Sequence, residues 1–315
     1  MKHKILLLLV FTCCNLLIIN AQQINVATYN IRNDNQGDVT KGNGWKQRCP
    51  VICQLIQFHQ FDIFGSQEVK KNQLDDMLNA MPEYAYVGVG RDDGKEKGEY
   101  SPVFYNKNKF KLLDSGNFWM SQITDRPNKG WDAALPRICS WGKFKMTEGG
   151  KSFWLFNLHM DHIGVVARSE SAKLVLDRIK SMCGKEPVIL MGDFNVDQFN
   201  EAYLLLNSSG IMMDVYDTAG LKYALNGTFN NFDPNLTTDK RIDHIFVSKQ
   251  FKALRYGVLT DTYRSDIKQD SLISSKNFPK EVSLQSSKAR MPSDHFPVLT
   301  TLNLSEEHAD CYVEI

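Results

Sequence analysis

Polar side chains recur directly after apolar, β-prone runs of this sequence, and their chemical types suit the binding of a metal ion and a phosphate group. The recurring residues are Asn30, Glu68, His159, Asp193, Asn195, Asp243, Asp294 and His295. One such residue alone would more often be a helix cap or a turn residue. Their recurrence favours a shared site, because a hard cation such as Mg²⁺ takes oxygen ligands from one or two carboxylates and keeps waters that a phosphate can replace.

The elements that must position these side chains follow from the spacing of the apolar residues. Alternating and β-branched runs predict strands at 24–31, 61–69, 84–89, 102–105, 137–144, 151–159, 187–191, 241–247 and 296–302. Helical spacing predicts helices at 47–58, 72–81 and 167–182. Residues 260–290 are rich in Ser and Lys. We expect them to form a long exposed insertion of the kind that often carries specificity.

The order of these elements favours an α/β fold. Strands interleave irregularly with a few helices, and segments such as 102–105 and 137–144 are expected to pair in antiparallel fashion through turns like Glu148-Gly149-Gly150. Two mixed, largely antiparallel sheets packed face to face, with helices on the outer faces, suit this order. We expect a single domain over residues 22–315, because no internal repeat or linker-like change of composition interrupts it.

The first residues predict an exported protein. Two lysines in Met1 to Lys4 precede an apolar run from Ile5 to Ile19, and Asn20-Ala21 follows it. This is typical of a signal peptide over residues 1–21, cleaved after Ala21, so we expect a periplasmic or secreted protein. A lipoprotein acylated at Cys13 or Cys14 is disfavoured because Thr12 is not the small residue expected before such a cysteine. No later run approaches the roughly 20 apolar residues of a transmembrane segment.

The charge of the chain is close to zero. The full sequence has a formal charge of +1, and loss of residues 1–21 would remove two lysines and no acids. Proteins that wrap long nucleic acids usually carry a basic stripe, because phosphate contacts supply most of the non-specific affinity.

Five cysteines follow residue 21, without metal-finger spacing. They are Cys49, Cys53, Cys139, Cys183 and Cys311. We expect mostly core or lone thiols, with one bridge left open.

Five short motifs carry a resemblance to a known family over nearly the whole chain after residue 21. They are TYNIR with Asn30, SQEV with Glu68, MGDFN with Asp193 and Asn195, IDHIF with Asp243, and PSDHFPV with Asp294 and His295. FNLHMDH with His159 also occurs in the same order. The sequence thus resembles the endonuclease/exonuclease/phosphatase superfamily, which contains pancreatic-type deoxyribonucleases, abasic-site endonucleases, neutral sphingomyelinases, inositol-phosphate phosphatases and deadenylases. The resemblance implies the four-layer αββα sandwich and Mg²⁺-assisted hydrolysis without a covalent intermediate.

Roles follow from the resemblance and from the chemistry of each residue type. Glu68 would hold Mg²⁺ (or Mn²⁺), with Asn30 fixing that carboxylate or touching phosphate and Asp294 reaching the metal directly or through water. The remaining five residues would be catalytic. Asp243 would orient His295, Asp193 would position or activate the attacking water, and Asn195 and His159 would donate to phosphate oxygens. The choice of general base between Asp193 and His295 stays open.

Three features depart from the motifs of the superfamily or lie outside them. Arg32 stands where some members carry an acid that touches the metal, so the choice between one and two metals stays open. Asp161 and His162 are expected to be loop residues, and His244 should point away from the site because it follows Asp243 on a strand.

The loops 90–99 and 119–137 are candidates for substrate selection. They offer Arg91, Trp131 and Arg137 as candidate substrate contacts.

These observations predict an exported, Mg²⁺-dependent phosphodiesterase or phosphatase that acts on a small or lipid-linked phosphate ester. An extracellular nuclease is the first alternative, and the absence of a basic stripe argues against it. A phosphate-binding module that has lost catalysis is the second, disfavoured because the acids, amides and histidines are all retained. The sequence does not distinguish monoesters from diesters and does not fix the oligomeric state.

Overall fold

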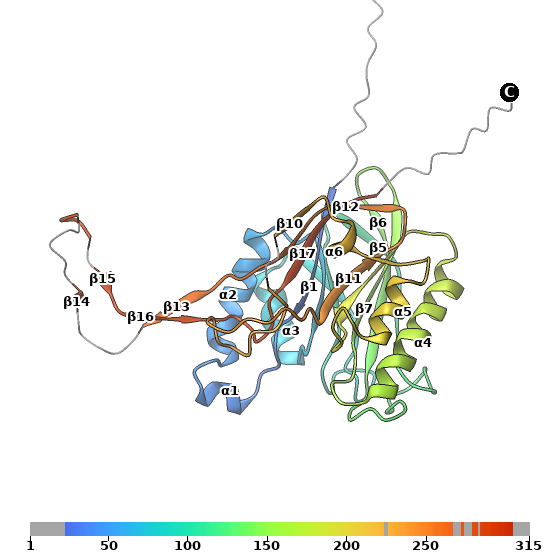
Figure 1. Cartoon of the computed structure of the whole chain (residues 1–315), viewed down its shortest axis with the longest axis horizontal. Coiled ribbons are helices and arrows are strands. Elements are labelled where there is room, and N and C mark those ends of the chain that lie inside the picture. Colours follow the sequence, from blue (N-terminus) through green and yellow to red (C-terminus); the bar gives the residue numbers. More distant parts are fainter. Residues whose placement is uncertain (1–22, 224–225, 267–271, 274–278, 283, 305–315) are drawn as a thin grey trace, which may run out of the picture.

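The computed structural model of the chain describes residues 23–223, 226–266, 272–273, 279–282 and 284–304 (Figure 1). Its helices are α1 (Gln36–Thr40), α2 (Trp45–Phe58), α3 (Lys71–Ala80), α4 (Val165–Cys183), α5 (Glu201–Asn207) and α6 (Val215–Thr218). In the described ranges no helix combines the length and the apolar character that crossing a membrane requires. The expected signal peptide, Cys13, Cys14 and Cys311 lie outside the described residues. Cys49, Cys53, Cys139 and Cys183 are free thiols.

Two large sheets form the centre of the molecule. The first has the order β10 (Leu221–Tyr223), β12 (Phe251–Val258), β17 (Val298–Leu304), β1 (Gln23–Asn30), β2 (Ile63–Gln67), β4 (Val103–Asn106) and β3 (Tyr84–Val87). The second has the order β5 (Phe110–Trp119), β6 (Ile138–Met146), β7 (Ser152–His159), β8 (Val188–Asp193), β11 (Asp243–Val247) and β9 (Met213–Asp214). Most neighbouring strands are antiparallel, whereas β1 with β2, β7 with β8 and β10 with β12 are parallel.

Three apolar clusters hold four layers together. The central cluster lies between the sheets and includes Val26, Ile63, Leu155 and Ile245. A second cluster joins the outer face of the second sheet to α4 and α5, and a third joins the outer face of the first sheet to α2 and α3. Figure 1 shows α2 and α3 on one side of the sheets and α4 and α5 on the other. The αββα sandwich is therefore confirmed.

Most expected elements are present, with one pairing corrected. Segments 102–105 and 137–144 do not pair with each other, because β4 lies between β2 and β3 in the first sheet and β6 lies between β5 and β7 in the second. The glycine-rich turn at 148–150 instead joins β6 to β7 in an antiparallel hairpin. β5, β12 and α5 were not predicted. The apolar residues of β5 and β12 are interrupted by charged or polar ones, and in β5 the middle of the strand is exposed.

The described parts of the expected insertion at 260–290 form pairs of short strands outside the two large sheets, and Arg290 contacts the rest of the chain at Lys41 and Asn43. β13 (Tyr263–Asp266) pairs with β16 (Ser287–Arg290), and β14 (Leu272–Ile273) pairs with β15 (Leu284–Gln285), both antiparallel. These pairs belong to neither large sheet and project away from it in Figure 1. The residues of this insertion whose burial is described are exposed or half-buried, whereas 267–271, 274–278 and residue 283 lie outside the described part.

One buried amide ties the two sheets together close to the ends of β2 and β7. The Asn157 amide nitrogen donates to the carbonyl oxygens of Ser66 and Pro102, each at 2.8 Å, and its oxygen accepts from the side chain of Gln67 at 2.7 Å. All these groups are buried away from water or nearly so. The amide therefore fixes the distance between sheets that carry different parts of the candidate site.

Replacement of Asn157 with alanine should lower the free energy of unfolding by about 2–4 kcal/mol, because it removes buried hydrogen bonds, leaves partners unpaired and opens a cavity. Denaturant unfolding of the variant measures the loss. The exposed Asn72→Ala variant is the matched control, expected to stay within about 0.5 kcal/mol of the parent. Equal stabilities of the two variants would contradict the role of Asn157.

Candidate active site

A pocket of about 400 Å³ opens at the end of the sandwich where β1, β2, β7, β8 and β11 present their polar ends. Its lining includes most of the residues singled out in the sequence, namely Glu68, Arg137, His159, Asp193, Asn195, Asp294 and His295. Arg32, Asn33, Glu99, Leu135, His162, Phe229 and Asn231 complete the lining. Asn30 and Asp243 lie behind this wall and contact its residues directly.

Strand register brings these side chains into rows. In the second sheet, Asp193 at the end of β8 is paired with His159 on β7 and with Asp243 on β11. Gly192 precedes Asp193 and has a φ of 151°, and a side chain there would clash with the carbonyl oxygen of Leu158. Glycine at this position therefore allows β7 and β8 to approach where the site begins.

Glu68 is held in a fixed orientation at the end of β2. Its Oε2 accepts from the backbone nitrogen of Asn33 at 3.1 Å and from the side chain of Asn33 at 2.7 Å. Its Oε1 accepts from the Asn30 amide nitrogen at 3.2 Å. Glu68 has a φ of 61°, a conformation that non-glycine residues rarely adopt and that marks functional sites when the surroundings enforce it. Asn30 thus presents nitrogen to Glu68, which suits positioning of the carboxylate.

The donor set around Glu68 fits a hard divalent cation. Asp294 reaches the same place from the loop before β17, and the Arg32 guanidinium lies 3.8 Å from Glu68 and 3.6 Å from Asp294. The two carboxylates, both nearly buried, thus face the same Arg32 guanidinium at distances longer than a hydrogen bond. Burial and the neighbouring Glu68 carboxylate raise the pKa of Asp294, because both disfavour its negatively charged form. Two carboxylates that converge in this way offer the oxygen ligands Mg²⁺ prefers.

Buried residues hold the segments that carry these candidate ligands. The Arg48 guanidinium on α2 donates to the carbonyl oxygens of Ile31, Arg32 and Pro292 at 2.5, 3.0 and 3.1 Å. The Ser293 hydroxyl donates to the carbonyl oxygen of Asn30 at 2.7 Å. The end of β1 and the loop before β17, which carries Asp294, are therefore joined, and Asn30 at the end of β1 in turn contacts Glu68. Arg48 gave no signal in the sequence because it lies inside a helix.

A second group, centred on Asp193, faces the Glu68 corner. Asp193 Oδ2 accepts from the Asn30 side chain at 2.9 Å and lies 3.5 Å from His159 Nε2 and 3.8 Å from His295 Nε2. His295 Nδ1 is 2.9 Å from Asp243 Oδ2. The ligand atoms of Asp193, Asp243 and His295 lie within 4.8 Å of one another. Because Asp243 and His295 are already engaged with each other, this group is better suited to proton handling than to holding a metal.

Burial and neighbouring charges separate the protonation states of this group. Burial and the Asp243 carboxylate raise the pKa of Asp193 to about 7. Burial alone would lower the pKa of His295, but Asp243 and Asp193 outweigh it and raise that pKa well above its ordinary value. Burial, with Arg137 and Arg91 nearby, holds the pKa of His159 well below its ordinary range. A charged imidazole, a neutral imidazole and a carboxylate that accepts protons near neutrality thus share one pocket.

Asp161 and His162, which were expected to be loop residues, form contacts on the other side of the pocket. Asp161 is buried and accepts from the backbone nitrogens of Ile163 and Gly164 and from Arg137 Nε at 3.2 Å. His162 Nδ1 lies 3.0 Å from Arg137 Nη2 and lines the pocket. Arg137 is thereby fixed from two sides at the pocket wall. The spacing of Asp161 and His162 behind His159 was the available signal for these residues.

Two of the substrate candidates do not line the pocket. Arg91 lies behind Glu99, and its Nη1 is 2.7 Å from Glu99 Oε2, so it reaches the pocket only through that carboxylate. Trp131 contacts the side chain of Gln122 through its backbone nitrogen and has a φ of 48°. Its side chain is half-buried. Trp119, whose ring nitrogen donates to the Arg91 carbonyl oxygen at 2.8 Å, anchors the 90–99 loop.

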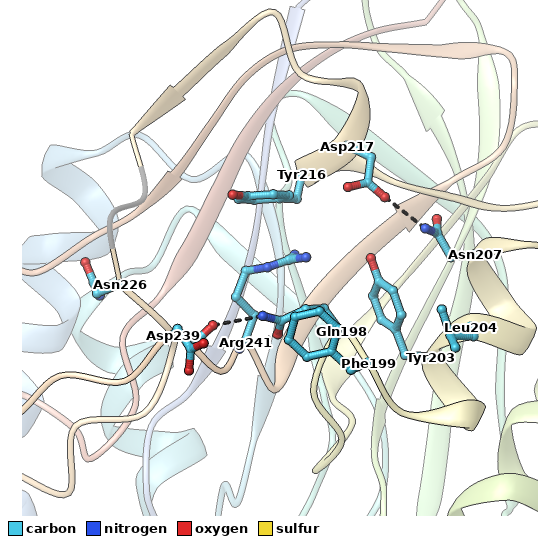
Figure 2. Close-up of a pocket in the computed structure, with 10 residues that line it drawn as sticks. All are labelled: Gln198, Phe199, Tyr203, Leu204, Asn207, Tyr216, Asp217, Asn226, Asp239 and Arg241. Carbon is cyan, nitrogen blue, oxygen red and sulfur yellow. Dashed lines mark hydrogen bonds between the residues drawn. The ribbon is translucent and has the colours of Figure 1, made fainter.

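Figure 2 shows a second, larger cavity of about 530 Å³ beside α5 and α6. The Arg241 guanidinium lies 3.8 Å above the Tyr216 ring and donates to Asp214 at 2.8 Å. Asn207 donates to Asp217, and Gln198 donates to the carbonyl oxygen of Asp239 (Figure 2). These polar groups pair with one another, and none of the candidate catalytic residues lines this cavity. The smaller pocket is therefore the candidate active site. His244 points away from it and contacts Tyr203 and Asp214.

Known proteins share both the sequence pattern and the fold. The model of the Endonuclease/Exonuclease/phosphatase family matches residues 27–295. A solved Bacteroides thetaiotaomicron protein of this family is 52% identical, with a TM-score of 0.84, and the match covers 91% of this chain and 99% of the other. The mannosyl-6-phosphatase Bt3783 of Bacteroides thetaiotaomicron is 53% identical, with a TM-score of 0.82, over 89% of this chain and 99% of the other.

A more distant structure shows the same fold. TDP2 from D. rerio in complex with a single-strand DNA product is 15% identical, with a TM-score of 0.64, over 90% of this chain and 99% of the other. The family match spans every candidate residue from Asn30 to His295. The chain therefore belongs to the endonuclease/exonuclease/phosphatase family and is a hydrolase of phosphate esters.

Proposed function

We propose that the protein is an exported, Mg²⁺-dependent phosphomonoesterase that acts on a phosphorylated sugar. The observation that carries this proposal is the convergence, in one pocket, of a carboxylate pair around Glu68 and the Asp193–His295–Asp243 group. The similarity to a mannosyl-6-phosphatase at 53% identity supports a sugar phosphate as substrate. Mn²⁺ offers the same kind of coordination and is expected to substitute.

Glu68 and Asp294 would hold the metal, and Asn30, Asn33 and Arg32 would orient their carboxylates. A bound divalent ion supplies Lewis-acid neutralisation of the phosphoryl oxygens. Asn30 also contacts Asp193, so one amide joins the metal-binding corner to the group that handles protons. We therefore assign Asn30 a positioning role.

Asp193 would accept the proton of the attacking water, because its raised pKa of about 7 makes it an effective base near neutral pH. His295, kept protonated by Asp243, would donate through Nε2 to a phosphoryl oxygen as negative charge grows. His159 would donate as a neutral imidazole. The Asn195 amide carries two hydrogens and donates to the Met160 carbonyl oxygen at 3.0 Å. The other amide hydrogen would be donated to a phosphate oxygen.

Export is part of the proposal and rests on the charged start and apolar run of residues 1–19. The mature protein is then expected to begin at Gln22. Mass spectrometry of the protein recovered from the periplasm or medium measures its N-terminus. Recovery of a chain that still carries residues 1–21 would contradict the proposed cleavage after Ala21.

Replacement of Glu68 with glutamine should weaken Mg²⁺ binding by about 100-fold or more, since even a change outside the direct ligands costs about 10–100-fold in metal affinity. Isothermal titration of metal-free protein with Mg²⁺ measures this loss independently of turnover. Glu201→Gln, at an exposed position of α5, is the control and should bind as the parent does. Unchanged Mg²⁺ affinity in the Glu68 variant would remove Glu68 from the metal site.

The ester class is tested by comparing mannose 6-phosphate with bis(p-nitrophenyl) phosphate as substrates of the mature protein in Mg²⁺. We expect phosphate release from the monoester with a kcat/KM at least about tenfold above that for the diester. A preference for the diester would overturn the monoesterase proposal. Degradation of single-stranded DNA at low salt, where phosphate contacts are strongest, would favour the nuclease alternative.

A further inference from the structure

One half-buried carboxylate in the pocket, that of Glu99, belongs neither to the proposed metal-binding pair of Glu68 and Asp294 nor to the group centred on Asp193. Glu99 lines the candidate active site together with Arg137, His159 and His295. Its side chain is 17% exposed, and burial raises its pKa although Arg91 opposes this. A carboxylate repels phosphate, so Glu99 works against the anionic part of a substrate. Its position in the pocket therefore suits a part of the substrate other than the phosphate group.

Contacts behind Glu99 hold its carboxylate in place and leave acceptor capacity free. Arg91 Nη1 lies 2.7 Å from Oε2, and Asn33 Nδ2 donates to Oε1 at 3.2 Å. Trp119 and the backbone of the 90–99 loop fix Arg91 in turn. A carboxylate has about four lone-pair sites, and these contacts use about two of them. The remaining sites can accept hydrogen bonds from hydroxyl groups.

Asn33 sets the position of Glu99 relative to the chemistry. The same Asn33 amide nitrogen donates to Glu68 at 2.7 Å and to Glu99 at 3.2 Å. Glu99 is therefore a neighbour of the metal-binding corner, one amide away from it. A group attached to a phosphate held at that corner would extend past Glu99. The apolar lining of the pocket consists of Leu135 and Phe229, of which Phe229 packs edge-on against His295.

We propose that Glu99, oriented by Arg91 and Asn33, is a specificity-determining residue that accepts hydrogen bonds from hydroxyl groups of a polyhydroxylated leaving group. This inference rests on the proposed phosphomonoesterase function. Glu99 compensates for its repulsion of phosphate only when the leaving group brings hydroxyl donors. A site built to pair with hydroxyls discriminates strongly against an analogue that lacks them, because its buried acceptor is then left unpaired.

The test compares mannose 6-phosphate with cyclohexylmethyl phosphate, which has a six-membered ring but no hydroxyls, on the mature Mg²⁺-loaded protein. Phosphate release gives kcat/KM for the parent, for Glu99→Gln and for Glu96→Gln. Glu96 is the matched control because it lies in the same loop and its side chain is 72% exposed. We expect the parent to prefer the sugar phosphate by about 10- to 100-fold, the range of a hydrogen bond to a charged group. Glu99→Gln should lose most of this preference while its rate on cyclohexylmethyl phosphate stays within about twofold.

The hydroxyl-free substrate separates specificity from structure. Equal losses on both substrates in Glu99→Gln would assign Glu99 a structural or catalytic role and overturn the proposal. Retention of the full preference in that variant would also overturn it, as would a parent enzyme without preference. If the parent hydrolyses neither ester, the proposed function itself has failed. If it hydrolyses only the hydroxyl-free ester, the monoesterase stands and the hydroxyl subsite falls.

Discussion

Replacement of Asp193 with asparagine is expected to lower kcat/KM for a phosphate monoester by about 10³-fold, within the range that a general base contributes. The variant keeps the size of the side chain and removes the group that accepts the proton. Asp193 is buried beside Asp243, and its raised pKa shows that its ionised form is disfavoured in the fold. The free energy of unfolding of the variant should therefore equal or exceed that of the parent.

Steady-state kinetics and denaturant unfolding of the same Asp193→Asn sample test both parts of this expectation. Asp217→Asn is the control, because Asp217 lies in the second cavity of Figure 2 and pairs with Asn207. The control should keep parental activity. Activity within about tenfold of the parent in Asp193→Asn would exclude Asp193 as the base.

Replacement of His295 with asparagine is expected to lower kcat/KM by about 10²–10³-fold, the effect of losing one preorganised donor to a developing negative charge. Asparagine can still present a donor where Nδ1 meets Asp243, but it has no atom at the position of Nε2. The variant thus separates the two functions of the ring. His295→Ala would in addition leave the buried Asp243 carboxylate unpaired, and it should be less stable by about 3–5 kcal/mol.

The combination of His295→Asn with Asp243→Asn tests whether the two residues act as a unit. Because Asp243 acts through His295, the double variant should lose about as much activity as the more severe single variant. Losses that multiply would show that Asp243 contributes independently of the imidazole. Parental activity in His295→Asn would remove the imidazole from the mechanism.

Local sequence patterns were sufficient to place the candidate site residues at strand ends close together. Asp193, Asp243 and His159 follow apolar runs, and strand register alone then places them in one row. Asn30 and Glu68 behave in the same way at the ends of β1 and β2. The burial of Asp193 and His295 could not be foreseen. Both are at most 5% exposed, and Phe229, which precedes β11 by a long loop, packs edge-on against the His295 ring.

Sequence patterns did not assign to the pocket the residues whose place there depends on loop conformation. Glu99 lies in a charged loop whose pattern is typical of a solvated turn, and only the folded chain places it beside Asn33. His162 reaches the pocket because Asp161 binds two backbone nitrogens and turns the chain. Arg32 marked a departure from the superfamily pattern, but its contacts to Glu68 and Asp294 depend on a left-handed backbone at φ 58°. No spacing rule encodes such contacts.

The measurement that tests the central claim most directly is phosphate release from mannose 6-phosphate by metal-free mature protein titrated with Mg²⁺. We expect no turnover above background in chelator, a saturable return of activity with Mg²⁺, and no return in Glu68→Gln at the same Mg²⁺ concentration. Full turnover in excess chelator, or equal Mg²⁺ activation of the parent and Glu68→Gln, would contradict the assignment of a metal-dependent phosphomonoesterase to this pocket.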